Sequence, residues 1–77
     1  MQKRLTKAQR EFLRWLWARE LHGILTTVET LRGHQRITFQ SLFRQGLVMI
    51  VGEGRLFQDR IRRTASAIVR EGEYISG

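Results

Sequence analysis

The amino-acid sequence predicts one small α+β domain, mostly helical, that spans residues 1–77. Three observations predict this fold class. Apolar residues recur at steps of three and four in several stretches, which is the spacing of one helical face. A β-rich run leads into Gly52-Glu53-Gly54 and then into alternating residues, as in a hairpin. Threonines and glycines stand where helices would begin and end. Residues 1–5 and 73–77 are expected to be flexible ends.

The first helix is expected to begin at the N-cap Thr6, where Gln9 completes a capping box, and to end at Gly23. Its apolar stripe faces the core. Trp15 falls almost opposite this stripe, so we expect it to face outward, either over long side chains or at an interface. The stripe consists of Phe12, Leu13, Leu16, Trp17 and Leu21.

A short second helix is expected to begin at Thr26 or Thr27 and to end near Gly33, with Val28 and Leu31 facing inward. A third helix follows the segment His34-Gln35-Arg36 and runs to about Gln45. Its apolar stripe consists of Phe39, Leu42 and Phe43, and Arg36, Gln40 and Arg44 lie away from that stripe.

Gly46 stands where the third helix must end in a residue with positive φ, which glycine adopts without strain. Residues 47–51 predict the first strand of the hairpin, residues 52–54 its turn, and Arg55 the start of the return strand. Thr64 is then the expected N-cap of a last helix that closes at Gly72. The inner side of this helix is expected to carry Ala65, Ile68 and Val69.

Two strings in this order resemble the winged helix-turn-helix family of DNA-binding domains, in its small bacterial or phage regulator form. "SLFRQGLVMI" is similar to the end of that family's recognition helix followed by its first wing strand. "RIRRTASAIV" resembles the step from the second wing strand through a threonine cap into the closing helix. The likeness covers roughly residues 6–72. It implies a compact fold of three helices, a β-hairpin wing and a C-terminal helix.

The resemblance also implies how the chain would bind DNA: the third helix enters the major groove and the hairpin lies on the neighbouring backbone. Residues 35–45 would be the recognition helix. Its groove-facing side chains would be Gln35, Arg36, Gln40 and Arg44, and contacts from the wing and to the backbone would come from His34, Arg55, Arg62 and Arg63.

The charge of the chain agrees with a polyanionic partner. Fourteen basic residues face seven acidic ones, giving a net charge of +7, and twelve of the fourteen are arginines. Arginine pairs with phosphates and guanine edges through a planar fork. A solvated arginine-rich surface is the plain alternative. We therefore expect a double-stranded DNA-binding protein, a transcriptional regulator or an accessory factor in recombination or phage development, that is cytoplasmic and nucleoid-associated.

Other function classes find less support in the sequence. There is no cysteine, the two histidines offer too few ligands for a metal, and no serine has a base beside it, so we expect no metal, no cofactor and no enzymatic activity. No stretch predicts a membrane span. The alternatives are a winged-helix adaptor or inhibitor that binds an acidic host protein, with Trp15 at its interface, and a binder of structured RNA. A homodimer is a further expectation, through the first helix with Trp15 or through the last helix.

Overall fold

The computed structural model describes residues 4–52 and 59–75. The helices in these ranges are α1 (Lys7–Leu21), η1 (Val28–Thr30), α2 (Gly33–Arg44), α3 (Ala65–Val69) and η2 (Glu71–Glu73), where η marks a 3₁₀ helix. The strands are β1 (Val48–Val51) and β2 (Arg60–Arg63), which pair antiparallel. A small, mostly helical α+β fold is therefore confirmed. The predicted hairpin turn and Arg55 lie outside the described residues.

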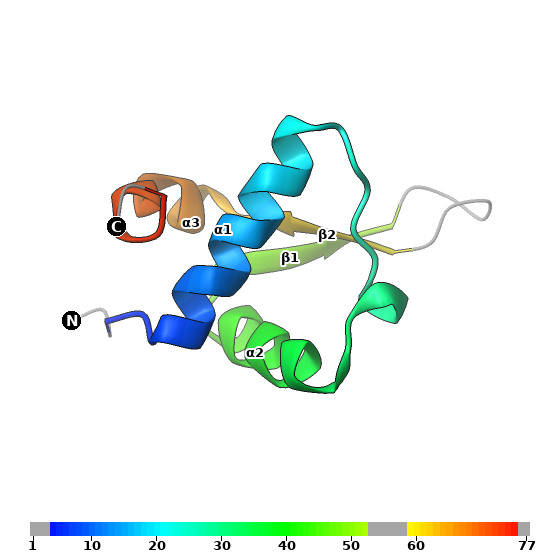
Figure 1. The fold of residues 1–77 in the computed structure, drawn as a ribbon, viewed down its shortest axis with the longest axis horizontal. Coiled ribbons are helices and arrows are strands. Elements are labelled where there is room, and N and C mark those ends of the chain that lie inside the picture. Colours follow the sequence, from blue (N-terminus) through cyan, green and yellow to red (C-terminus); the bar gives the residue numbers. More distant parts are fainter. Residues whose placement is uncertain (1–3, 53–58, 76–77) are drawn as a thin grey trace.

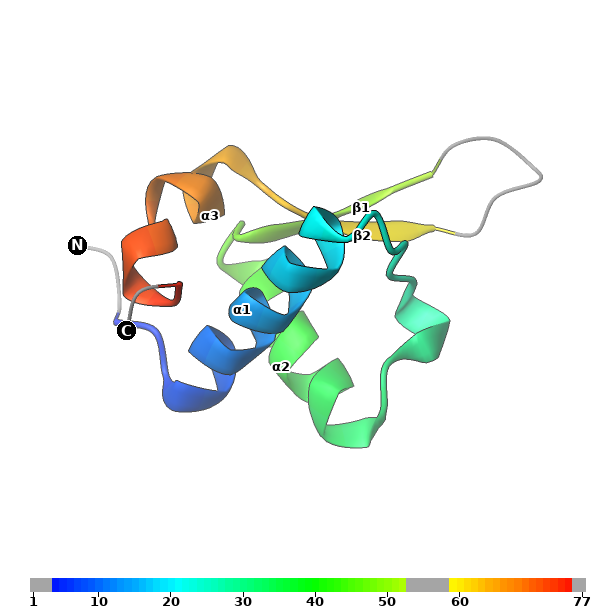
Figure 2. The same ribbon diagram turned by 45° about the horizontal axis from the view of Figure 1, so that its top comes forward.

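Helix α1 crosses the middle of the molecule and separates the other two α-helices. In Figures 1 and 2, α2 and α3 lie on opposite sides of α1, and the hairpin runs behind it. The core consists of the buried residues that these elements turn toward one another. They are Leu5, Phe12, Leu13, Leu16, Leu31, Phe39, Leu42, Leu47, Val48, Ile61, Ala67 and Tyr74.

The predicted helix caps are present. The backbone N–H of Gln9 donates to Thr6 Oγ1 over 3.1 Å, and the backbone N–H of Thr6 donates to Gln9 Oε1 over 2.9 Å, so the capping box is complete. At α3 the backbone N–H of Ala67 donates to Thr64 Oγ1. These bonds satisfy donors that no residue within the helix can reach, which fixes where each helix begins.

The predicted second helix is wrong in length and kind, because only the three residues of η1 are helical. The segment before it is extended and pairs with the hairpin. The backbone N–H of Ile61 donates to the carbonyl of Thr26 over 2.8 Å, and Thr27 forms an antiparallel bridge with Arg60. Threonine is β-branched and favours this extended conformation. Thr26 and Thr27, which the sequence assigned to a helix, therefore pair with β2 instead.

Two predicted core positions on the first and third helices are corrected by the structure. Leu21 is 65 % exposed at the end of α1, and Phe43 is 49 % exposed on α2. Trp17 packs only partly against the core. The polar residue Gln9, by contrast, is buried. Its Nε2 donates to Ser41 Oγ over 2.8 Å, which connects α1 to α2.

The predicted inner side of the last helix is also wrong. Ala65 is exposed, Ile68 is 49 % exposed and Val69 is 85 % exposed, whereas Ala67 is fully buried. The space beside Ala67 is filled by Tyr74, whose exposed fraction is 0 %. Tyr74 and the buried Leu5 both come from the segments that the sequence assigned to flexible ends. Helix α3 ends at Val69 rather than at Gly72, because η2 turns the chain back over it.

Gly46 has the positive φ that the sequence predicts, +73°, and a Cβ placed there would meet nothing within 4 Å. Gly46→Ala should therefore cost only the backbone strain of a left-handed residue, about 1–2 kcal/mol of unfolding free energy. Gly33→Ala is the matched control: its Cβ would also meet nothing, and its φ is not positive. Urea unfolding should show the control unchanged or slightly stabilised. Equal losses in both variants would contradict this account of Gly46.

Candidate nucleic-acid interface

The outer face of α2 is basic and carries no opposing charge. Between Glu29 and Glu53 the sequence has three arginines and no acidic residue. Arg36, Gln40 and Arg44 are all exposed. They are spaced four apart, so at 100° per residue they lie along one side of the helix. The structure thus brings together three of the four groove-facing residues that the sequence predicted.

The opposite side of α2 holds the helix on the core. Phe39 and Leu42 are buried there. Arg36 is oriented at the start of the helix, where its Nε donates to the carbonyl of Leu31 over 3.1 Å. This bond uses only Nε. The terminal nitrogens of this exposed guanidinium can therefore still donate to a ligand.

Gln35 has a different place from the one that the sequence predicted. Its Oε1 accepts a 3.0 Å hydrogen bond from the backbone N–H of Arg32, the N-cap residue of α2, and the side chain is half-buried. Gln35 also lines a hollow of about 220 Å³ beside Trp15 on α1. It therefore holds the start of α2 rather than facing outward. His34 borders the same hollow but is exposed, so it remains accessible to a phosphate.

Two exposed residues of this region were not among the predicted contacts. Arg32 lies at the N-cap of α2, where its charge adds to the positive end of the helix dipole. Ile37 is 71 % exposed on the outer face. The sequence does carry a signal for Ile37, because the residue lies far from Phe39 and Leu42 at helical spacing.

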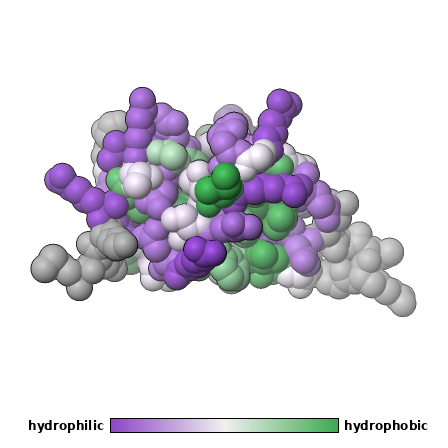
Figure 3. Space-filling model, turned by 90° about the horizontal axis from the view of Figure 1, so that it is seen from below, coloured by the Kyte–Doolittle hydropathy of each residue, from purple (hydrophilic) through white to green (hydrophobic). Residues whose placement is uncertain are grey.

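A shallow groove of about 220 Å³ continues from α2 onto the hairpin. It is lined by Phe39, Gln40, Phe43, Arg44 and Ile50. Figure 3 shows the molecule from the α2 side, where green apolar side chains lie among purple polar ones near the middle of the face. Polar and apolar groups therefore share this surface.

The hairpin turns its second face away from the helices. Val48 and Ile61 are buried on the face that packs on the core, whereas Arg62 pairs with Met49 and both are exposed on the other face. Because successive residues of a strand point to opposite faces, Arg62 lies on the other side of the hairpin from Ile50. Arg62 is accessible, but it does not join the groove of α2.

Arg63 lies in an ion-pair cluster inside the protein, which we call the Arg63 cluster. Its side chain is 9 % exposed, with Nε 2.9 Å from Glu20 Oε2 and Nη1 3.2 Å from Glu71 Oε1. Nη1 also donates to the hydroxyl of Tyr74 over 3.0 Å. Burial disfavours the charged guanidinium, but the hydrogen bonds from Arg63 to Tyr74 and Glu20 outweigh it and raise the pKa of Arg63. We therefore exclude Arg63 from the candidate interface.

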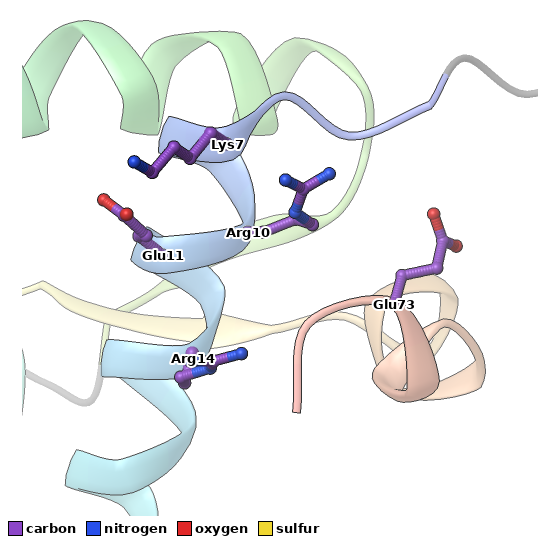
Figure 4. A pocket seen from close by; sticks show the side chains of 5 residues that line it. All are labelled: Lys7, Arg10, Glu11, Arg14 and Glu73. Atoms are coloured by element: carbon purple, nitrogen blue, oxygen red, sulfur yellow. The ribbon is translucent and has the colours of Figure 1, made fainter. Parts of the chain in front are cut away.

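A hollow of about 460 Å³ lies between α1 and η2, and both signs of charge line it. In Figure 4, Lys7 and Glu11 lie on one side of α1, while Arg10 and Arg14 point toward η2, which carries Glu73. Arg10 and Arg14 donate to the backbone carbonyls of Leu5 and Tyr74.

The carboxylates make this hollow a poor site for a phosphate. The hydrogen bond from Arg70 is the main cause that lowers the pKa of Glu73, and it outweighs burial, which acts to raise that pKa. Glu73 therefore keeps its negative charge at neutral pH. Because Glu11 also lines the hollow, two carboxylates oppose the attraction that Lys7, Arg10 and Arg14 would exert on an anionic ligand. The outer face of α2 has no such repulsion.

Trp15, the predicted interface residue, is half-buried, and its ring contacts other side chains of the protein. Its ring centroid lies 5.5 Å from that of Phe12, and the guanidinium carbon of Arg19 lies 4.9 Å from the ring centroid. Arg19 in turn donates to Thr26 Oγ1 and to the carbonyl of Leu25. These contacts give Trp15 a role in holding the end of α1.

Compared with models of protein families, with curated proteins and with solved structures, the chain matches none. Among the residues that the structure describes, no three histidine, aspartate or glutamate side chains gather to hold a metal ion. In the same ranges no helix has both the length and the apolar character to span a membrane.

Proposed function

We propose that the protein binds double-stranded DNA with α2 in the major groove, as a winged-helix domain does, and serves as a regulator or accessory factor on DNA. The observation that carries this proposal is the outer face of α2, which displays Arg36, Gln40 and Arg44 with no acidic residue between Glu29 and Glu53. In the major groove, arginine pairs with guanine O6 and N7, and glutamine pairs with adenine N6 and N7.

The remaining contacts position the helix. Arg32 and His34 lie at the start of α2, where the helix dipole also favours a phosphate. Arg62, on the outer face of the hairpin, adds a backbone contact at the side of the duplex. Such contacts supply affinity without sequence information, and selectivity comes from the side chains that reach the bases.

A salt titration on duplex DNA tests the proposal. If the protein neutralises about five phosphates, the logarithm of its binding constant should fall with the logarithm of the salt concentration at a slope of about −4 to −5. The target sequence comes from selection on a random duplex library at low salt. A flat slope, or no binding to any duplex, would overturn the proposed function.

Arg36→Ala should reduce the discrimination between the selected site and a random duplex by about 1–3 kcal/mol. Arg70→Ala is the charge-matched control, because Arg70 lies at the end of α3, where its Nε pairs with Glu73 over 2.6 Å. It should leave the discrimination unchanged and alter only the salt-dependent affinity. The measurement is fluorescence anisotropy on both duplexes. Equal loss of discrimination in the two variants would contradict the assignment of α2 as the reading helix.

A protein-binding function remains the second candidate because of exposed apolar residues at the end of α1. Leu21 is 65 %, Ile24 48 % and Leu25 54 % exposed. Exposed apolar side chains of this kind are typical of a protein interface. The duplex selection separates the two candidates, since an adaptor with a net charge of +7 would still be attracted to any duplex at low salt but would select no sequence.

A further inference from the structure

Large apolar side chains stand among the polar and basic ones on the outer face of α2. Ile37 is 71 % exposed and Phe43 is 49 % exposed. Each is three residues from Gln40, so at 100° per residue each lies about 60° around the helix from it, on either side. Phe43 also lines the groove that Gln40, Arg44 and Ile50 share.

A basic face that binds DNA meets very little apolar surface in the major groove. The one apolar group that the base edges display there is the C5-methyl of thymine. Glutamine binds adenine, and the thymine paired with that adenine shows its methyl in the same groove. Three residues rise about 4.5 Å along a helix, which is comparable with the 3.4 Å rise between base pairs. Side chains one turn from Gln40 therefore reach the same base pair or the next one.

We propose that Ile37 and Phe43 contact thymine methyl groups beside the adenine that Gln40 binds, so that α2 selects A·T pairs by their methyls as well as by hydrogen bonds. The inference rests on the proposed function and names the bases that it reads. The guanidinium groups of Arg36 and Arg44 lie on the same face and draw the duplex onto it. A duplex held there covers apolar side chains that water otherwise surrounds.

Deoxyuridine provides the test, because it differs from thymidine only in lacking the 5-methyl group. The probe is the duplex selected by the wild-type protein, with each thymine in turn replaced by deoxyuridine. Each contacted methyl should be worth about fourfold in affinity, the equivalent of about 0.8 kcal/mol per buried carbon. Replacement of thymines outside the footprint should have no effect.

Ile37→Ala and Phe43→Ala should each lose the difference between thymine and deoxyuridine at one position while still binding the duplex. Val69→Ala is the matched control, since Val69 is a β-branched residue that is 85 % exposed on α3, away from α2. It should keep the full fourfold difference. Thermal unfolding by circular dichroism establishes that all three variants are folded.

The outcomes separate this inference from the function on which it rests. Wild-type protein that binds thymine and deoxyuridine duplexes with equal affinity overturns the inference and leaves the proposed function standing. So does a fourfold difference that survives both α2 substitutions. Absence of binding to any duplex overturns the proposed function, and the inference with it.

Discussion

Tyr74→Ala is expected to lower the free energy of unfolding by about 3–5 kcal/mol, the usual cost of removing a large aromatic side chain from a core. The side chain of Tyr74 is fully buried, with an exposed fraction of 0 %. A domain of this size has a total stability of about 4–12 kcal/mol. The substitution should therefore remove a large part of that stability, although Tyr74 lies in a segment, residues 73–77, that the sequence assigned to a flexible end.

The contacts of Tyr74 explain why the effect should be so large. Its hydroxyl donates to the carbonyl of Ala67 over 2.7 Å and accepts from Arg63 Nη1. Its own carbonyl accepts a 2.7 Å hydrogen bond from Arg14 Nε on α1. One residue thus connects α3, β2 and α1. Urea unfolding measures the loss, and Glu73→Ala is the neighbouring control, since Glu73 is exposed. A loss below 1 kcal/mol in Tyr74→Ala would contradict this role.

Tyr74→Phe isolates the hydroxyl and adds a pH signature. Burial raises the pKa of Tyr74, and the hydrogen bond from Arg63 opposes that only in part. A raised folded pKa means that the neutral phenol is favoured in the folded state. The stability is then fully present below the unfolded pKa of about 10 and is lost as the pH rises through the folded pKa. Wild-type protein should lose more stability than Tyr74→Phe between pH 8 and 11.

The local elements of this fold were predictable because their causes are local. The hydroxyls of Thr6 and Thr64 each accept a hydrogen bond from a backbone N–H only three residues later. Such caps can be predicted without knowing how the rest of the chain folds. The same holds for Gly46, whose positive φ follows from its place after a helix. The residues on the outer side of α2 were predictable for the same reason, because the burial of Phe39 and Leu42 determines which residues of the helix face away from the core.

The features that were missed depend on residues far apart in the sequence. Thr26 is extended because it pairs with Ile61 of β2, thirty-five residues later. Ala67 rather than Ile68 faces inward because Tyr74 folds back beside it. In a helix of five residues, periodicity contains too few positions to identify the buried side. Composition could not indicate these pairings, since each of the residues is ordinary in its own neighbourhood.

The two neighbouring arginines of β2 show the same limit at the candidate site. The sequence treats Arg62 and Arg63 alike, as contacts to the DNA backbone. In the strand they point to opposite faces, so only one of them meets Glu20, which lies 43 residues earlier on α1. The alternation is predictable from strand geometry. Which face is the inner one depends on where α1 packs.

Arg63→Met should therefore lower the free energy of unfolding by about 2–3 kcal/mol, whereas Arg62→Met should change it by less than about 0.5 kcal/mol. Removing the Arg63 guanidinium leaves Glu20 and Glu71 facing each other and takes a donor from the Tyr74 hydroxyl. The cost is below that of a fully buried pair, because the two carboxylates are 28 % and 38 % exposed. The midpoint of thermal unfolding should fall by about 10–20 °C in Arg63→Met.

Duplex binding should rank the same two variants in the opposite order. At a temperature where both are folded, Arg62→Met should bind DNA more weakly and with a salt slope reduced by about 1, since it removes an exposed phosphate contact. Arg63→Met should keep nearly the affinity and slope of the wild-type protein, because its guanidinium faces Glu20 and Tyr74 rather than solvent. Both variants carry the same change in net charge, so long-range attraction cannot explain a difference. Equal salt slopes in the two variants would place the DNA elsewhere than on the outer face of the hairpin.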